Sequence, residues 1–247
     1  SFVGLDGVFH VAAFAKPWTQ DKSTYYNINE IGTKNVAEAC VKNGVKRLVY
    51  TSSAGIHGAQ QNGNLIDEST WPVEYFTDYE QSKFNGRNEA LSFMSDQLEV
   101  VIVSPARVYA PGKVSESNVP ARMISIYLNK KVGVAAASGK GIGSYAFIDD
   151  IVHGHILAMT KGVSGEEYLL GGDNKNYIEF FGILAELTGK KYPILKVPYQ
   201  LSLLIGKTQL FLAETMGVQP MITTPWVRKY LKDWGVNSEK IKLIGYN

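Results

Sequence analysis

The sequence predicts an α/β protein built on a doubly wound parallel sheet, with a smaller helix-rich lobe. Through the first 112 residues, short apolar runs alternate with longer amphipathic segments, and the runs end in small or hydroxyl-bearing residues. Such alternation of strand and helix requires parallel pairing through right-handed crossovers. After residue 112 the sequence changes to helical segments punctuated by prolines, which predicts the lobe.

Three buried strands are expected, at residues 7–13, 48–52 and 100–103. Each is apolar along its whole length, as in strands that are covered on both faces. Two helices should connect them, at about residues 23–43 and 77–95. The first has small and apolar residues at three- and four-residue spacing and stops at Asn43-Gly44, and Thr77 or Asp78 can cap the second.

The chain is expected to divide into two units. Residues 1–112 form the sheet domain, to which residues 144–172 return, and residues 113–143 and 173–247 form the lobe. The apolar stretch 201–213 is interpreted as a core helix of the lobe rather than as a membrane or substrate element.

Composition disfavours several classes of function. The net charge is +2 and the basic residues are scattered, so no nucleic-acid partner is expected. The single cysteine, Cys40, cannot form an internal disulfide, which favours a reducing, cytoplasmic compartment. No apolar run has the length of a membrane span, and no side chains have metal-ligand spacing, so neither a membrane span nor a metal site is expected.

A tyrosine and a lysine lie one helical turn apart at the start of the second helix. On a shared helix face, Lys83 could lower the pKa of Tyr79 for proton transfer near neutral pH. The pattern alone is weak, because a chain with 14 tyrosines contains such pairs by chance. Its context is more specific, since Thr51-Ser52-Ser53 places hydroxyls at the carboxyl end of a buried strand, where α/β sheets bind ligands. The alternative is that these hydroxyls only turn the chain and that Tyr79 is a surface residue.

Together these motifs resemble those of the extended short-chain dehydrogenase/reductases, the NAD-dependent epimerase/dehydratase family. The similarity covers essentially the whole chain and is greatest to dihydroflavonol-4-reductase-like and hopanoid-associated epimerase-like proteins. The segments that carry it, in chain order, are residues 10–13, 29–35, 49–54, 79–83, 104–112, 147–151 and 168–172.

The resemblance implies a Rossmann-type sheet, an NAD or NADP cofactor, and a small-molecule substrate bound by the lobe. Tyr79 would be the general acid/base, Lys83 would tune it and bind the nicotinamide ribose, and Ser53 would orient the substrate oxygen. Asn29 would support the lysine and a proton-relay water, although a helix residue bonded to backbone explains it equally well. The residues implied to contact the cofactor are Ala12, Ala13, Thr51, Tyr79, Lys83, Pro105 and Val108. The histidines His10, His153 and His155 are expected to be structural.

The glycine-rich dinucleotide fingerprint of this fold is absent. Gly4 and Gly7 precede a strand, with His10 where a third glycine should be, and the glycines of residues 139–143 are interpreted as a surface turn. Because the chain begins at Ser1 without Met, we expect the first βαβαβ portion to lie upstream. The residue that distinguishes NAD from NADP would lie there too, so cofactor preference stays open.

Two departures from the family pattern narrow the range of possible substrates. Dehydratases carry an Asp-Glu pair where this chain has Ala54-Gly55, and epimerases carry an Arg-Asp pair where it has Gly143-Ser144, so a sugar diphosphate would lose an anchor. Phe14, Trp18, Tyr109 and the apolar stretch 201–205 are expected around the mouth of the pocket, which favours an uncharged, fairly lipophilic substrate.

We therefore expect hydride transfer between NAD(P)H and a carbonyl or secondary alcohol of a small, fairly lipophilic substrate. The alternatives are an NAD-dependent sugar epimerase that uses the same tyrosine and serine, a non-catalytic cofactor-binding relative, and a truncated fragment unable to bind cofactor. The resemblance also implies a homodimer, in which the helices at residues 23–43 and 77–95 form a four-helix bundle.

Overall fold

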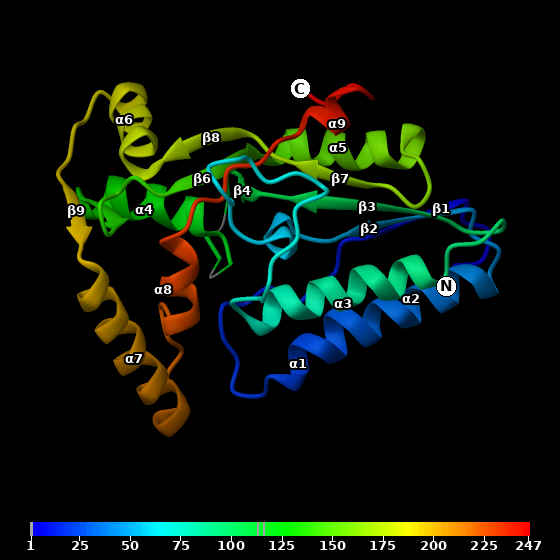
Figure 1. Ribbon diagram of the computed structural model, residues 1–247, viewed down its shortest axis with the longest axis horizontal. Helices are drawn as coiled ribbons and strands as arrows, with labels where there is room; N and C mark the ends of the chain where they lie inside the picture. Colours follow the sequence, from blue (N-terminus) through cyan, green and yellow to red (C-terminus); the bar gives the residue numbers. More distant parts are fainter. Residues whose placement is uncertain (1, 113, 116) are drawn as a thin grey trace.

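The first three strands of the chain belong to one parallel sheet. In the computed structural model, which describes residues 2–112, 114–115 and 117–247, this sheet has four strands in the order β1-β2-β3-β7. They are β1 (Gly7–His10), β2 (Arg47–Thr51), β3 (Glu99–Pro105) and β7 (Glu167–Leu170). All three pairings are parallel, so the carboxyl ends of the strands lie at one edge of the sheet (Figure 1). The predicted α/β fold class is confirmed.

Neighbouring residues of the central strands face opposite sides of the sheet. Val49 and Val101 belong to the apolar core under α5 (Ile148–Lys161), whereas Leu48 and Val100 belong to the core on the other side. Because both sides are covered, these strands are apolar at consecutive positions, residues 48–50 in β2 and 100–103 in β3, rather than at alternate ones.

Helices cover both faces of the sheet, with α5 on one side and α2 and α3 on the other (Figure 1). The predicted helix at residues 23–43 is present as three consecutive segments: α1 (Ser23–Tyr26), a π-helical turn (Asn27–Ile31) and α2 (Gly32–Lys42). The second predicted helix is α3 (Asp78–Ser92), which begins at Thr77 as expected. The Thr77 hydroxyl accepts the backbone N–H of Glu80, and the Glu80 carboxylate accepts the backbone N–H of Thr77.

The π-helical turn is not predicted by the sequence pattern. It packs against α3 at Gly86, where a Cβ would overlap the Asn29 carbonyl and lie 2.6 Å from the Tyr50 hydroxyl. Turns of this kind are frequent at functional sites. This one places Asn29, which is 1% exposed, in the contact between the two helices.

The second half of the chain adds short strands that the sequence analysis missed, and the helices of the lobe. The remaining elements are the 3₁₀ turn η2 (Ala54–His57), a sheet of β4 (Arg107–Tyr109), β6 (Ile142–Phe147) and β8 (Asp173–Asn176), a sheet of β5 (Gly133–Ala136) and β9 (Ile194–Val197), and the helices α4 (Val119–Lys130), α6 (Tyr177–Thr188), α7 (Tyr199–Met216), α8 (Thr224–Tyr230) and α9 (Glu239–Lys242). Lys113, with which the predicted lobe begins, lies outside the described residues.

The stretch predicted to return to the sheet does so only in part. β7 pairs with β3, and α5 covers the sheet, but β6 pairs with β4 and β8. The surface turn predicted at residues 139–143 is correct in part: Gly139 has a φ of +76° but is buried, and Gly143 lies buried in β6.

The prediction of a core helix at residues 201–213 is wrong. In α7, Leu201, Leu204 and Phe211 are 47%, 61% and 64% exposed, and the buried residues are Gly206 and Ala213. Apolar content alone cannot show how many neighbours cover a helix, and α7 lies at the periphery of the lobe (Figure 1). Within the described residues, no helix combines the length and apolarity that a membrane span requires.

Candidate active site

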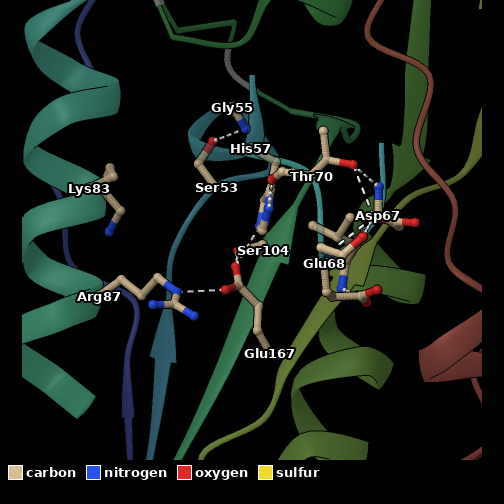
Figure 2. A network of polar contacts seen from close by, with 12 residues as sticks. Ser53, Gly55, His57, Asp67, Glu68, Thr70, Lys83, Arg87, Ser104 and Glu167 are labelled. Atoms are coloured by element: carbon tan, nitrogen blue, oxygen red, sulfur yellow. Dashed lines mark hydrogen bonds and ion pairs between the residues drawn. The ribbon is translucent and has the colours of Figure 1, made fainter. Parts of the chain in front are cut away.

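Tyr79 and Ser53 are brought together at the carboxyl edge of the sheet. Tyr79 lies in the first turn of α3, and Ser53 caps the η2 turn that follows β2. The Ser53 hydroxyl lies close enough to the Tyr79 phenol to lower its pKa. The Ser53 hydroxyl also accepts the backbone N–H of Gly55 at 3.2 Å, which fixes its direction (Figure 2). Two hydroxyls held this way can bind one substrate oxygen and exchange a proton with it.

Lys83 lies one turn after Tyr79 and is 2% exposed. Its Nζ donates to the Thr51 carbonyl at 2.6 Å and lies 4.4 Å from the centre of the Tyr50 ring. Burial lowers the pKa of Lys83 to about 7, so the amine is readily deprotonated near neutral pH.

The expected lowering of the Tyr79 pKa by Lys83 is not found. Burial raises the pKa of Tyr79, the hydrogen bond with Ser53 lowers it, and the Glu80 carboxylate raises it; the net direction is upward. The reason is that Lys83 points at the Thr51 carbonyl and the Tyr50 ring, and carries a weakened charge.

Asn29 holds the segment that follows β1. Its Oδ1 accepts the Phe14 backbone N–H at 2.7 Å, and its Nδ2 donates to the Phe14 carbonyl at 3.1 Å and to the Ser82 hydroxyl at 3.0 Å. These bonds join the π-helical turn, the Phe14 segment and α3. The proposed support of Lys83 by Asn29 stays a prediction.

The carbonyl and the hydroxyl of Thr51 are both hydrogen-bonded. Its carbonyl accepts from Lys83, and its hydroxyl lies 2.9 Å from Nε2 of His155. Because Nδ1 of His155 lies 2.7 Å from the Ile151 carbonyl, that nitrogen carries the proton, and Thr51 donates to Nε2. Burial lowers the pKa of His155, which keeps the ring neutral, as expected for a structural histidine.

His10 is also a buried, hydrogen-bonded residue, as expected. Its Nε2 lies 3.1 Å from the Thr33 hydroxyl, and Thr33 in turn donates to the Asn29 carbonyl at 2.7 Å. Burial and the charge of Lys83 lower the pKa of His10 to about 4.

The residues predicted to contact the cofactor line the same edge. Ala12 and Ala13 are exposed just beyond β1, which ends at His10, three residues earlier than expected. Pro105 ends β3, and Val108 lies in β4 and packs partly against the core under α5.

A buried carboxylate beneath this edge was missed by sequence reasoning (Figure 2). Glu167 of β7 is 4% exposed and has three partners from three elements. The distances are 2.8 Å to His57 Nε2, 2.6 Å to Arg87 Nε and 2.6 Å to the Ser104 hydroxyl. His57 ends the turn that Ser53 begins, and Arg87 lies one turn after Lys83, so Glu167 ties together the elements that carry the catalytic candidates.

His57 and Arg87 both contact the Glu167 carboxylate. Nδ1 of His57 lies 2.9 Å from the Thr70 carbonyl and Nε2 lies 2.8 Å from Glu167, so both ring nitrogens face acceptors. Burial alone would raise the pKa of Glu167, but the hydrogen bond and charge of His57, the charge of Arg87 and the Ser104 hydroxyl lower it to about 2.

Two pockets lie on the side of the lobe. One, of about 340 Å³, lies within the lobe and is lined by none of the catalytic candidates; its lining is mostly apolar side chains such as Met123, Ile205 and Trp226, and Arg122 is its one charged residue among those described. The other, of about 640 Å³, lies at the start of α3 and is lined by Trp18, as expected. The other two aromatic residues predicted at the pocket pack elsewhere, Phe14 on Tyr25 and Tyr109 on Phe147. Over the described ranges, no three His, Cys, Asp or Glu side chains are grouped to hold a metal ion.

The arrangement of strand ends, hydroxyls and a Tyr/Lys helix can be compared with known proteins. The sequence profile of the NAD dependent epimerase/dehydratase family matches residues 1–171. The chain belongs to this family. As an extended short-chain dehydrogenase/reductase, it is 30% identical over 246 residues to a "Putative dihydroflavonol 4-reductase" of Synechocystis sp.. It is 31% identical over 199 residues to "Sterol demethylase protein B" of Methylococcus capsulatus.

Among solved structures, this family member superposes on gox2253 with a TM-score of 0.80 at 27% identity, over 100% of the chain. The matches to the two curated relatives cover 96% and 80% of the chain. The chain spans 70% and 60% of the lengths of these relatives and 74% of gox2253.

Proposed function

We propose that this chain is the greater part of an NAD(P)-dependent oxidoreductase, which transfers a hydride between the nicotinamide and a carbonyl or secondary alcohol. The observation that carries the proposal is the placement of Tyr79, in the first turn of α3, and of Ser53, at the cap of the η2 turn, at the carboxyl edge of the sheet, where the Ser53 hydroxyl lowers the pKa of Tyr79. Ligands of open α/β sheets bind at this edge, and a family defined by NAD dependence matches the segment that forms it.

The residues at the edge fit a nicotinamide nucleotide. An ammonium has three donors, and within the described part of the chain Lys83 uses one of them on an acceptor, the Thr51 carbonyl. The others suit the hydroxyls of the nicotinamide ribose. The exposed methyl groups of Ala12 and Ala13 leave the backbone open to close approach, and Pro105 and Val108 would flank the ring.

The chain's own residues would orient the substrate and move its proton. When bound, the nicotinamide supplies or accepts the hydride. In the direction of reduction, Tyr79 gives its phenolic proton to the substrate carbonyl oxygen, which becomes the alcohol oxygen. Ser53 donates a hydrogen bond to the same oxygen and holds it against Tyr79, and in oxidation the phenolate takes the proton back.

The pocket between the helices of the lobe favours a fairly lipophilic substrate. Its lining is mostly apolar, and its volume of about 340 Å³ is at the lower end of the range for small-molecule sites. The relatives named for dihydroflavonol and sterol chemistry agree with such a substrate.

A second candidate, a sugar epimerase, is favoured by one observation. Although β6 lacks the expected Arg-Asp pair, the guanidinium of Arg107 in β4 lies over Gly143, where a Cβ would overlap it. Its Nη1 donates to the Tyr145 hydroxyl at 3.2 Å. A guanidinium in this place could bind a diphosphate.

Isotope transfer distinguishes the two. The full-length protein is incubated with NADH or NADPH deuterated at the transferable position and with 3-ketosteroids, dihydroflavonols or UDP-glucose as probes. An oxidoreductase gives deuterated alcohol and an equal amount of oxidised nucleotide. Epimerised UDP-glucose without net oxidation of the nucleotide would support the second candidate instead.

We also propose that the protein is a homodimer through α1 to α3. Apolar side chains are exposed in the π-helical turn and in α2, with Ile28 at 41%, Ile31 at 49% and Val41 at 44%. A symmetric partner would cover them. Analytical ultracentrifugation tests this directly, and a monomer at micromolar concentration would refute it.

A further inference from the structure

A buried ion pair joins the lobe to the catalytic helix. Lys229 lies in α8, and its Nζ is 2.5 Å from Oε1 of Glu80, the residue that follows Tyr79. The Glu80 side chain is 1% exposed and the Lys229 side chain 11%. Removing two charges from water is costly, so a pair this deep needs favourable surroundings.

Aromatic side chains hold Lys229 in place. Its Nζ lies 4.8 Å from the ring centres of both Trp226 and Trp234. The indole of Trp226 donates to the Pro17 carbonyl, and that of Trp234 donates to the Lys229 carbonyl, both at 2.7 Å. Because both indoles are held by hydrogen bonds, the Lys229 ammonium between them has little freedom to move.

The carboxylate is equally constrained. Its Oε2 accepts the backbone N–H groups of Phe76 and Thr77 at 3.0 and 3.1 Å, which leaves Oε1 for Lys229. Glu80 is thus part of the cap of the catalytic helix. Its charge would stay beside Tyr79 if Lys229 were removed.

The ion pair also lies against the turn that carries Ser53. A Cβ on Gly55 would lie 3.1 Å from Lys229 Nζ, 3.3 Å from Ser53 Oγ and 3.4 Å from Glu80 Oε1. These three atoms therefore converge on one point, and glycine is the residue that lets them do so. The Ser53 hydroxyl in turn lowers the pKa of Tyr79.

We propose that Lys229 is a positioning residue of the catalytic site, which neutralises the Glu80 carboxylate beside Tyr79 and seats the lobe on the Ser53 turn. The proposal rests on the proposed role of Tyr79 as general acid/base. The pKa of Tyr79 would then depend on the docking of the lobe as well as on the catalytic helix. The Glu80 carboxylate raises this pKa, and Lys229 offsets the charge of the carboxylate. Among the described residues, the other titratable groups around Tyr79 and Glu80 include Asp78 and Lys83 of α3, Tyr75 just before α3, Tyr25 of α1, Tyr50 of β2 and Tyr230 of α8.

The test is a charge cycle read from the titration of Tyr79 itself, which needs neither substrate nor cofactor. Tyrosine labelled with ¹³C at Cζ is followed by NMR against pH, and Tyr79→Phe assigns the signal. Lys229→Met keeps the aliphatic stem between the indoles, and Glu80→Gln keeps an acceptor for the helix cap. The double variant completes the cycle.

Lys229→Met should raise the Tyr79 pKa by about one unit, because a buried carboxylate is left unneutralised beside the phenol. Glu80→Gln should lower it by a similar amount, and the double variant should return toward the parent. Lys229→Arg keeps the charge and should titrate like the parent, as should Lys232→Met, which removes an exposed lysine nearby.

Two results would overturn the proposal: a Glu80→Gln variant in which Tyr79 titrates no earlier than in the parent, or a Lys229→Met shift that persists without Glu80. A merely structural role for Lys229 would lower stability without these opposite shifts. Unchanged turnover in Tyr79→Phe would refute the proposed function and leave this titration intact, so the two can fail separately.

Discussion

Replacing Glu167 by Gln should destabilise the protein strongly, although the change is nearly isosteric. At pH 7 the carboxylate is the counter-charge of Arg87 and contacts His57 Nε2 at 2.8 Å, in a site where it is 4% exposed. The amide leaves the Arg87 guanidinium without its counter-charge. Removing one partner of a buried ion pair is among the most destabilising single changes.

The pKa of Glu167 sets the size of the effect. Its fall from the usual 4.5 to about 2 corresponds to about 3 kcal/mol of stabilisation of the folded state at neutral pH. Since the folded pKa is the lower one, this stabilisation is complete above pH 4.5 and is lost as the pH falls toward 2. The Gln variant lacks it at every pH.

Urea unfolding followed by circular dichroism measures the difference. Glu167→Gln should lose about 3 kcal/mol of unfolding free energy at pH 7, and the gap from the parent should narrow as the pH falls below 4.5. The matched control is Glu166→Gln, whose carboxylate is 49% exposed and pairs with Lys240 at 2.6 Å. That change should cost less than about 1 kcal/mol. Equal losses in the two variants, or a gap independent of pH, would refute the reasoning.

Three further predictions concern packing, protonation and assembly. Gly86→Ala should lower the free energy of unfolding by about 1–3 kcal/mol, because the added Cβ overlaps the π-helical turn. The control Gly182→Ala, whose Cβ meets open space in α6, should be neutral or stabilising. Equal melting temperatures for the two variants would contradict this prediction. Burial lowers the pKa of His10 from 6.5 to about 4, so the stability that the neutral ring contributes should fall as the pH drops through this window, by up to about 3 kcal/mol. In His10→Gln this pH dependence of stability should be absent. A variant whose stability follows that of the parent between pH 6.5 and 4 would refute the prediction. Ile31→Glu should convert the proposed dimer to monomer in sedimentation, and a persistent dimer would exclude this face.

The sequence predicts the sheet and the catalytic candidates because both depend on local signals. A strand covered on both faces is apolar throughout, and the start of α3 carries its own cap at Thr77. Tyr79, Lys83 and Ser53 then follow from the places where a helix begins and a strand ends. The short strands β4, β5, β8 and β9, of three or four residues each, carry no comparable pattern.

The Glu167 network could not be predicted in the same way. Its partners His57, Arg87 and Ser104 are 110, 80 and 63 residues away in the sequence. No periodicity links positions so far apart. The one available signal was a glutamate at the start of an apolar strand, where a charge needs a buried partner. The exposure of α7 was missed for a related reason, since burial depends on distant elements that cover a helix rather than on its own composition.

The central claim is that Tyr79 carries the proton in a hydride-transfer reaction, and one substitution tests it most directly. In full-length protein, Tyr79→Phe removes the phenolic hydroxyl and leaves the ring. With the substrate found by isotope transfer, we expect kcat/KM to fall by about 10²–10⁴-fold while the affinity for the nicotinamide nucleotide is retained. An unchanged kcat/KM would contradict the account, because the placement of Tyr79 beside Ser53 would then have no part in the chemistry.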